Sequence, residues 1–421
     1  MGSSASGGAT LNATTRVLIG LVLGALAGLA LDAYDSAVAV KVADWIQPLG
    51  RLWLNALQMT VVPLVFALVV VGVNAASDAA ASGRIARRAL VVFVVLLTIG
   101  VTVAAVAAPM LYGLFTRHPS LAAALGGAVS AGAPSATQVG WADWLNGIVP
   151  SNALMAAAQS AMLPLVVFAL FFGFAVSRIE AARRELLVTF FQAIADAMIV
   201  TVRWVLEAAP FGVFALILAV CARAGMHMIG ALGVYVLVES TLYVMATLLM
   251  LLVAWLWGGE SLRRYVPALV PAQIVAASTQ SSLAALPAML ESAQRLGYPQ
   301  RIAALVLPMA VSLCRLTSPV QYIASSCFIA WALGIDLGPA QLIAGAALAV
   351  VISLGAVSLP GQVSFLATNM PVAQAMGVPV GPLALMLAVD ALPDAIGTAG
   401  NVTADITAVS VVTRQSSADA A

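Results

Sequence analysis

Charged residues are scarce in this sequence. Lysine, arginine, aspartate and glutamate make up 8% of the 421 residues, Lys41 is the one lysine, and the formal net charge is +1. A soluble globular domain has about 25% charged residues, so the composition excludes an ordinary soluble domain. The chain also lacks a basic stripe, which argues against a nucleic-acid interface.

Cysteine and histidine are rare as well. Cys221, Cys314 and Cys327 lie in apolar runs, without the spacing of a disulfide pair or a zinc site. His118 and His227 fall in short connections between apolar segments. A serine hydrolase in the membrane would need a base, and neither a histidine nor the lysine lies near a candidate serine. We therefore expect no enzymatic activity and no cofactor.

Apolar residues fill the remainder of the chain. They make up 62% of it, and the mean hydropathy is +1.06. Segments long enough to cross about 30 Å of hydrocarbon recur between short polar connections. They predict an all-α polytopic membrane protein with eight transmembrane helices and two re-entrant helical hairpins. The predicted parts are a disordered tail (1–15), six spans (16–34, 45–75, 86–115, 151–177, 188–222 and 229–257, within 16–260), the first hairpin (261–299), the seventh span (300–335), the second hairpin (336–378), the eighth span (379–414) and a tail (415–421).

The two hairpins are predicted from interruptions in apolar segments. SSLAALP at 281–287 and SLGAVSLPG at 353–361 each place proline among small residues. Proline breaks the helical hydrogen-bond ladder, so each segment is expected to turn back within the membrane. Paired interrupted segments in corresponding halves point to the binding site of a transporter.

Arginine clusters predict the orientation. They fall in every second connection, at 84–88, 178–184 and 263–264. Basic residues collect on the cytoplasmic side, so both termini are expected to lie in the cytoplasm. The protein itself is expected to be integral to the cytoplasmic (inner) membrane.

The last span carries an unusual polar face. Asp390, Asp394, Thr398, Asn401 and Asp405 share an arc of about 80° at 100° per residue. A carboxylate at the bilayer centre costs roughly 2.5–3.5 kcal/mol, so this face needs water, cations or a charged ligand opposite it. Its first two aspartates suit a substrate ammonium group or a cation, and its last two members offer oxygen ligands for Na⁺.

Other polar residues can join this face or neutralise it. The hydroxyls of Ser281 and Ser282, at a broken helix end, can bind a carboxylate or can simply satisfy neighbouring carbonyls. Arg315, in the middle of the seventh span, can form an ion-pair network with the aspartates, although one arginine faces three carboxylates. Glu239, in the sixth span, is expected to pair with a charge on a packed helix or to contact a wet surface.

Several stretches carry a resemblance to a known family. RVLIGLVLGALAGL from Arg16, MTVVPLVFALVVVGV from Met59, PLVVFALFFGFAVSRI from Pro164, APFGVFALI from Ala209 and DALPDAIGTAGNVTADIT from Asp390 resemble the dicarboxylate/amino acid:cation symporter family. The resemblance runs from about residue 16 to residue 414. It implies a homotrimer in membrane lipid that moves a small molecule, an amino acid or a related carboxylate, by an elevator-type mechanism, with H⁺ or Na⁺ as coupling ion.

The resemblance also suggests roles for residues. The candidate substrate-binding residues are Ser281, Ser282, Arg315, Ser318, Leu359, Gly361, Asp394, Thr398 and Asn401, of which Leu359 and Gly361 belong to the tip of an extracellular gate. The candidate cation ligands are Asn401 and Asp405. The candidate coupling residues are Asp390, Arg315 and Asp405.

Two departures from the family pattern alter these expectations. Members that carry acidic amino acids have an arginine where this chain has Gly397, so a gap is expected there and an acidic substrate is in doubt. The Asn-Met-Asp-Gly-Thr motif of the seventh span reads Cys-Arg-Leu-Thr-Ser from Cys314, so Leu316 replaces a sodium-binding aspartate.

These departures leave several mechanisms open. Arg315 can stand in for the charge of Na⁺ beside Asp390 or Asp405, or it can reach the gap at Gly397 and bind a second substrate carboxylate. A proton on Asp390 or Asp394 is the natural substitute for Na⁺, because burial favours the neutral carboxyl group. Ordinary Na⁺ symport, uncoupled exchange and an anion channel remain alternatives.

Overall fold

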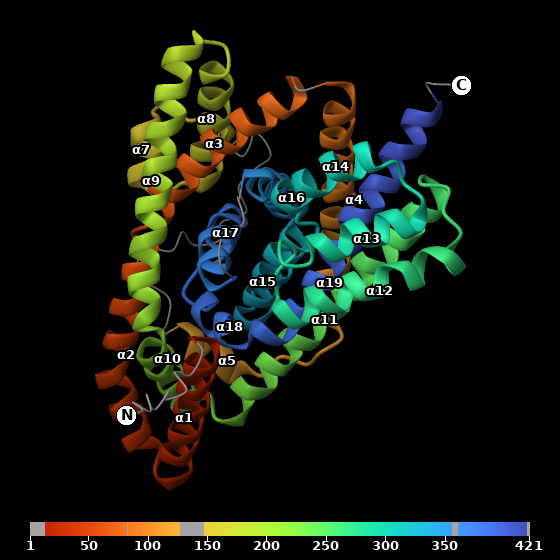
Figure 1. The fold of residues 1–421 in the computed structure, drawn as a ribbon. Coiled ribbons are helices and arrows are strands. Elements are labelled where there is room, and N and C mark those ends of the chain that lie inside the picture. Colours follow the sequence, from red (N-terminus) through yellow and green to blue (C-terminus); the bar gives the residue numbers. More distant parts are fainter. Residues whose placement is uncertain (1–12, 82, 127–146, 356–360, 419–421) are drawn as a thin grey trace, which may run out of the picture.

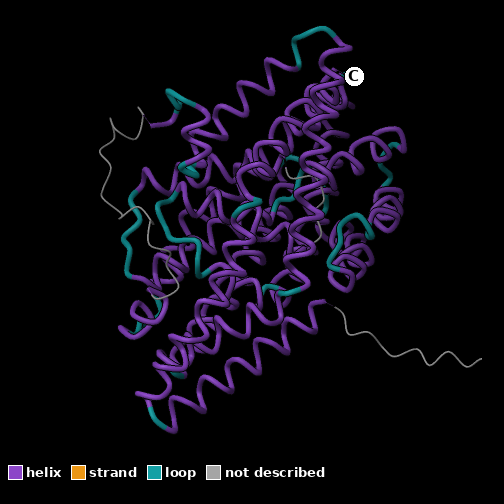
Figure 2. Tube along the Cα trace, turned by 90° about the vertical axis from the view of Figure 1, so that its left-hand side faces the viewer, coloured by secondary structure: helices purple, strands orange, loops and turns teal. Residues whose placement is uncertain are grey.

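The fold is helical throughout the part of the chain that is placed. The computed structural model describes residues 13–81, 83–126, 147–355 and 361–418 (Figure 1). Within these ranges all regular elements are helices and no strand occurs (Figure 2). The predicted all-α class is therefore confirmed.

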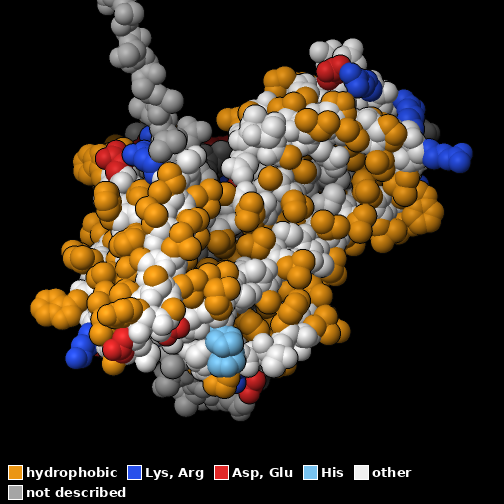
Figure 3. Space-filling model, turned by 90° about the horizontal axis from the view of Figure 1, so that it is seen from below, with side chains coloured by type: hydrophobic (Ala, Val, Ile, Leu, Met, Phe, Trp, Pro, Cys, Tyr) orange, Lys and Arg blue, Asp and Glu red, His pale blue; other side chains and the backbone are white. Residues whose placement is uncertain are grey.

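Length and composition of the helices fit a multi-pass membrane protein. Among the described residues, seven helical segments are long and apolar enough to cross a membrane, namely Thr15–Tyr34, Ser36–Asp78, Arg84–Gly113, Ala181–Glu207, Met226–Leu256, Gln300–Leu333 and Ala391–Ser416. Apolar side chains cover much of the face in Figure 3, whereas most charged groups lie near its margins. The rings of His118 and His227 are stacked, with centroids 3.6 Å apart.

Two predicted spans are broken rather than continuous. The fourth consists of α7 (Ala153–Ala158) and α8 (Met162–Val176), and Ser160 between them has a left-handed φ of 53°. The fifth consists of α9 (Ala181–Glu207) and α10 (Ala209–Ala224). Pro210 follows this second break, because proline is well tolerated only in the first turn of a new helix.

Close backbone packing joins α1 (Ala13–Tyr34) to α10. Gly20, Gly24 and Gly28 are spaced by four residues and so share one face of α1. A Cβ atom at any of them would approach a backbone carbonyl oxygen of α10 within 2.4–2.7 Å. Small residues at such a spacing let two membrane helices meet backbone to backbone. Helix α2 (Ser36–Gln58) packs on the other side of α10.

The second half of the chain surrounds the last helix, which lies among α11, α12 and α14 (Figure 1). The predicted eighth span is divided at Asp390, between α18 and α19. The helices not yet given are α3 (Val61–Ala81), α4 (Arg84–Gly113), α5 (Pro119–Gly126), α11 (Met226–Leu256), α12 (Leu262–Thr279), α13 (Leu286–Leu296), α14 (Gln300–Leu313), α15 (Thr317–Leu333), α16 (Pro339–Gly355), α17 (Gly361–Ala375), α18 (Leu383–Val389) and α19 (Ala391–Ala418).

Helix pairs occupy the two regions predicted as hairpins. Helix α12 packs against α13, and α16 packs against α17. The turn between α12 and α13 contains Gln280, whose φ of 50° is left-handed. The tip of the second pair, including Leu359, lies outside the described residues. A re-entrant path of either pair through a membrane stays a prediction.

Candidate functional site

The candidate site is built around a break between α14 and α15. Helix α14 ends at Leu313 and α15 begins at Thr317, which frees backbone groups that a continuous helix would pair. The Thr317 amide donates to Oδ1 of Asn401 over 2.8 Å, and the Thr317 hydroxyl donates to the Gly397 carbonyl over 3.1 Å. Helix α19 therefore supplies the partners that make the break stable inside the protein.

The polar face of α19 turns toward this break. Thr398, Asn401 and Asp405 are 5%, 4% and 1% exposed, and Asp394 is half-buried. Asp390, just before α19, accepts a 2.7 Å hydrogen bond from the side-chain amide of Gln321 in α15. The polar arc expected from helical periodicity thus lies against α15, inside the protein.

Arg315 lies within the break and close to the aspartates. Its side chain is half-buried and interacts electrostatically with Asp390, Asp394 and Asp405. Its backbone carbonyl accepts from the hydroxyl of Ser353 in α16 over 3.2 Å. This position matches a cation placed among the carboxylates, and it does not match a side chain that extends to the membrane surface.

The residues beside Arg315 provide an apolar surface. Leu316 is fully buried, and its Cδ1 lies 2.8 Å from where a Cβ atom on Gly100 of α4 would be. Cys314 is 1% exposed. Among the described residues, no group of three or more histidine, cysteine, aspartate or glutamate side chains is arranged to hold a metal ion. Oδ1 of Asp405 is buried and has no hydrogen-bond partner among the residues that the structure describes.

The gap expected at Gly397 is filled, so that expectation was wrong. A Cβ atom there would lie 3.0 Å from Cε2 and 3.2 Å from Cζ of Tyr243 in α11, and 3.3 Å from Oγ1 of Thr317. Tyr243 is 2% exposed. An aromatic ring from another helix thus occupies the space directly beside the glycine.

Glu239 also lies in this region of the protein. The sequence did not predict that Glu239 would be part of the candidate site. It is 0% exposed, which rules out the expected wet surface, and the described residues form no ion pair with it. Its Oε1 accepts a 2.9 Å hydrogen bond from the hydroxyl of Tyr243. One signal was available: tyrosines at 235 and 243 lie one helical turn before and after it, on the same face.

The turn between α12 and α13 approaches the same region. The side chain of Gln280 donates to the Ala391 carbonyl over 2.8 Å, which ties the turn to the start of α19. Ser281 accepts through Oγ from the Ala284 amide over 3.2 Å, and Ser282 beside it is half-buried. The Ser281 oxygen therefore accepts from a neighbouring backbone amide, and a role of this serine in substrate binding stays a prediction.

The remaining candidates are placed less completely. Ser318 is 8% exposed, in the first turn of α15, and its amide donates to the Arg315 carbonyl over 3.1 Å. Gly361 begins α17. Leu359 lies outside the described residues, so its predicted place at the gate is not described either.

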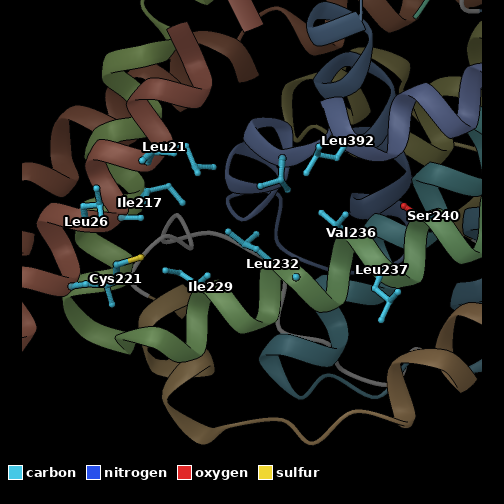
Figure 4. Close-up of a pocket in the computed structure, with 15 residues that line it drawn as sticks. Leu21, Leu26, Ile217, Cys221, Ile229, Leu232, Val236, Leu237, Ser240 and Leu392 are labelled. Carbon is cyan, nitrogen blue, oxygen red and sulfur yellow. The ribbon is translucent and has the colours of Figure 1, made fainter. Parts of the chain in front are cut away.

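A separate apolar crevice of about 610 Å³ lies beside the polar region. Helices α1 and α10 form one of its walls, and α11 with the start of α19 forms the other (Figure 4). Figure 4 shows side chains from both walls facing the space between them, among them Leu21, Ile217, Leu232, Val236 and Leu392. This lining suits hydrocarbon rather than a charged solute, so the crevice is distinct from the polar site.

Comparison with known proteins places this arrangement among transporters. The model of the sodium:dicarboxylate symporter family matches residues 13–415. The chain is 30% identical over 403 residues to a proton/glutamate-aspartate symporter of Escherichia coli K12, which covers 95% of this chain and 92% of the relative. It is 29% identical to a proton/sodium-glutamate symport protein of Bacillus caldotenax, covering 81% of this chain and 80% of the relative. It is 29% identical to C4-dicarboxylate transport protein 3 of Bradyrhizobium diazoefficiens, covering 81% of this chain and 75% of the relative.

Proposed function

Because the chain belongs to the sodium:dicarboxylate symporter family, we propose that it moves an amino acid or a related carboxylate by alternating access, without Na⁺ coupling. The predicted resemblance is confirmed. Since the relatives named above are transporters, the expectation that the chain is not an enzyme is confirmed as well.

The main support for the proposed absence of Na⁺ coupling is the presence of Arg315 and Leu316 in the break between α14 and α15. Na⁺ is a hard cation that requires several oxygen ligands, and Leu316 supplies a buried hydrocarbon surface instead. Arg315 brings a permanent positive charge to Asp390, Asp394 and Asp405. A bound cation would add its charge where the protein already holds one.

The polar face of α19 supports a substrate that carries an amino group. Asp394 is half-buried next to the buried Thr398, so a carboxylate and a hydroxyl lie together. An ammonium group is attracted by that carboxylate, whereas a dicarboxylate is repelled by it. Tyr243 beside Gly397 leaves less room for a long acidic side chain.

The proton is the coupling ion in this proposal. With Na⁺ excluded, three carboxylates (Asp390, Asp394 and Asp405) face one arginine and Glu239 adds a fourth beside Asp390 and Asp394, so protonation is the simplest way to reduce the excess negative charge. A homotrimer, an elevator-type movement, cytoplasmic termini and an inner-membrane location belong to the proposal through the family.

Ordinary Na⁺ symport is the second candidate. It is favoured by Oδ1 of Asp405, a buried carboxylate oxygen without a hydrogen-bond partner in the described residues. In that mechanism Asp405 would hold a cation, with help from Asn401. However, Oδ1 of Asn401 already accepts from the Thr317 amide.

Transport by the purified protein in proteoliposomes tests the proposal. Labelled L-aspartate, L-glutamate, succinate and L-alanine are offered with NaCl or choline chloride outside, with and without an alkaline interior. We expect saturable uptake that responds to the pH gradient and not to Na⁺. Strong Na⁺ stimulation at fixed pH would contradict the proposal and support the second candidate.

Two additions make the result specific. Counterflow of labelled against unlabelled solute requires a carrier, so its absence alongside solute-independent ion current would identify a channel.

Arg315→Met should weaken uptake and introduce a dependence on added cations, whereas Arg203→Met, at an exposed position on α9, is the matched control. If Arg315→Met shows the same uptake and the same cation dependence as Arg203→Met, the role proposed for Arg315 is contradicted.

A further inference from the structure

Glu239 is a buried carboxyl group whose surroundings do not account for its charge. It lies in the middle of α11, is fully buried, and accepts a hydrogen bond at Oε1 from Tyr243, while the side chains of Tyr235 and Gln321 also lie within hydrogen-bonding reach of the carboxyl group. Its Oε2 has no hydrogen-bond partner in the described part of the protein. An ionised carboxylate in such a place lacks both water and a counter-charge, whereas a carboxyl group that carries a proton is neutral.

A second group with an unpaired polar atom faces it from another helix. Tyr112 of α4 is 1% exposed, its hydroxyl has no partner among the described residues, and it interacts electrostatically with Glu239. Tyr112 is held in a cluster of rings, with centroids 6.0 Å from those of Phe328 and Trp331. Two buried polar atoms without partners, on facing helices, mark a place that holds a proton or a water molecule.

The pair formed by Glu239 and Tyr243 connects this place to the candidate substrate face. The ring of Tyr243 lies against Gly397, and its hydroxyl points to the carboxyl group. Thr317 touches the same glycine and caps the break that contains Arg315. A change at the face of α19 therefore reaches Glu239 through one aromatic side chain.

The acidic neighbours of Glu239 lie on the side of the substrate face. Asp394 of α19 and Asp390 at the junction of α18 and α19 interact electrostatically with it. Helix α15 contributes the neutral Gln321, which donates to Asp390 and is also a hydrogen-bonding neighbour of Glu239. Helices α5, α10 and α12 also pack on α11, and their described residues contribute no hydrogen-bond or ion-pair partner to Glu239. Tyr112, Tyr235 and Tyr243 are its other titratable neighbours.

We infer that Glu239 carries the transported proton, and that Tyr243 positions this carboxyl group relative to the substrate face. The proton is taken from the outer aqueous phase together with substrate and is released to the cytoplasm. Its role is to keep Glu239 neutral while Asp390 and Asp394 remain available to the substrate and to Arg315. This inference rests on the proposed transport function and adds the identity of the proton-binding residue.

Glu239→Gln tests the inference, because the amide keeps the size and the acceptor for Tyr243 but cannot take up the proton. Asp196→Asn is the matched control, since that carboxylate is exposed on α9. Both proteins are reconstituted with a pH-sensitive dye inside, and the four labelled solutes named above are the probes. Counterflow at equal pH, uptake under a pH gradient and acidification of the interior are measured together.

We expect Glu239→Gln to retain counterflow. Uptake driven by the pH gradient should fall by about tenfold, within the range typical of coupling between two sites, and acidification should disappear. Gradient-driven uptake and acidification equal to those of the control overturn the inference. Loss of counterflow in a protein with an unchanged thermal midpoint overturns it too, because Glu239 is then needed for substrate binding or translocation itself and not for proton coupling.

A second variant keeps the test decisive if Glu239→Gln does not fold. Tyr243→Phe removes the hydrogen bond to the carboxyl group and leaves the ring in place beside Gly397. The pH at which counterflow is half-maximal should then shift, and an unchanged pH profile overturns the inference. A wild-type protein that shows no counterflow of any probe refutes the transport function itself, which separates the two failures.

Discussion

The contact between Tyr243 and Gly397 can be tested by adding one methyl group. Gly397→Ala would place a Cβ atom 3.0 and 3.2 Å from two ring carbons, closer than the roughly 3.5–4.0 Å of an ordinary carbon–carbon contact. Tyr243 cannot easily move aside, because it is 2% exposed and its hydroxyl is held by Glu239. Overpacking of this kind typically costs about 1–3 kcal/mol.

The steric destabilisation by the added methyl group must be separated from the ordinary effect of a glycine-to-alanine change on helix stability. Replacing glycine by alanine inside a helix stabilises it by up to about 1 kcal/mol, which would conceal part of the strain. Gly230 in α11 is the matched control, since a Cβ atom there would meet nothing within 4 Å. The difference between Gly397→Ala and Gly230→Ala therefore isolates the steric term.

The measurement is the thermal midpoint of the detergent-solubilised protein, followed by tryptophan fluorescence. We expect Gly397→Ala to unfold roughly 2–6 °C below Gly230→Ala. In a Tyr243→Ala background the same change should lose most of its penalty, because the two side chains are in direct contact. Equal midpoints for the two alanine variants, or a penalty that persists without the ring, would refute the reasoning.

Two other substitutions test the break between α14 and α15. Asn401→Ala removes the acceptor of the Thr317 amide and should destabilise the protein by about 1–3 kcal/mol, whereas Asn401→Asp keeps an acceptor; equal falls in thermal midpoint would contradict that role. Leu316→Asp places a carboxylate against Gly100, so it should lower the midpoint in choline chloride, and NaCl should restore several degrees because a ligand at 100 times its Kd contributes about 2.7 kcal/mol. A midpoint that does not distinguish the two salts would show that Leu316 alone does not block an ion site.

Hydropathy and helical periodicity predicted much of this protein because both are local signals. The apolar runs gave the membrane segments, and a count of 100° per residue placed Asp394, Thr398 and Asn401 on one face of α19. Pro210 was an available local signal for the break before α10, although the fifth span was predicted as continuous. In each case the information lies within a few residues of the feature.

The rest depends on contacts between residues far apart in the chain. Gly397 looked like a gap because its own helix offers no side chain there, and the ring that fills the space comes from Tyr243 in α11. Glu239 looked like an ordinary charge pair because no basic residue can be excluded as its partner without tertiary structure. The division at Ser160 was also missed, because Pro164 in the first turn of α8 does not by itself show where the preceding helix ends.

The glycine face of α1 has a consequence for how the protein is made. Its partner α10 begins only at Ala209, so α1 leaves the ribosome and enters the bilayer long before that partner exists. Until then Gly20, Gly24 and Gly28 face lipid or another helix, and the close backbone contact cannot form. Assembly of this part of the molecule is therefore delayed until the fifth predicted span has been inserted. Chains that stop earlier would display an unpaired helix surface, which makes them recognisable to membrane quality control.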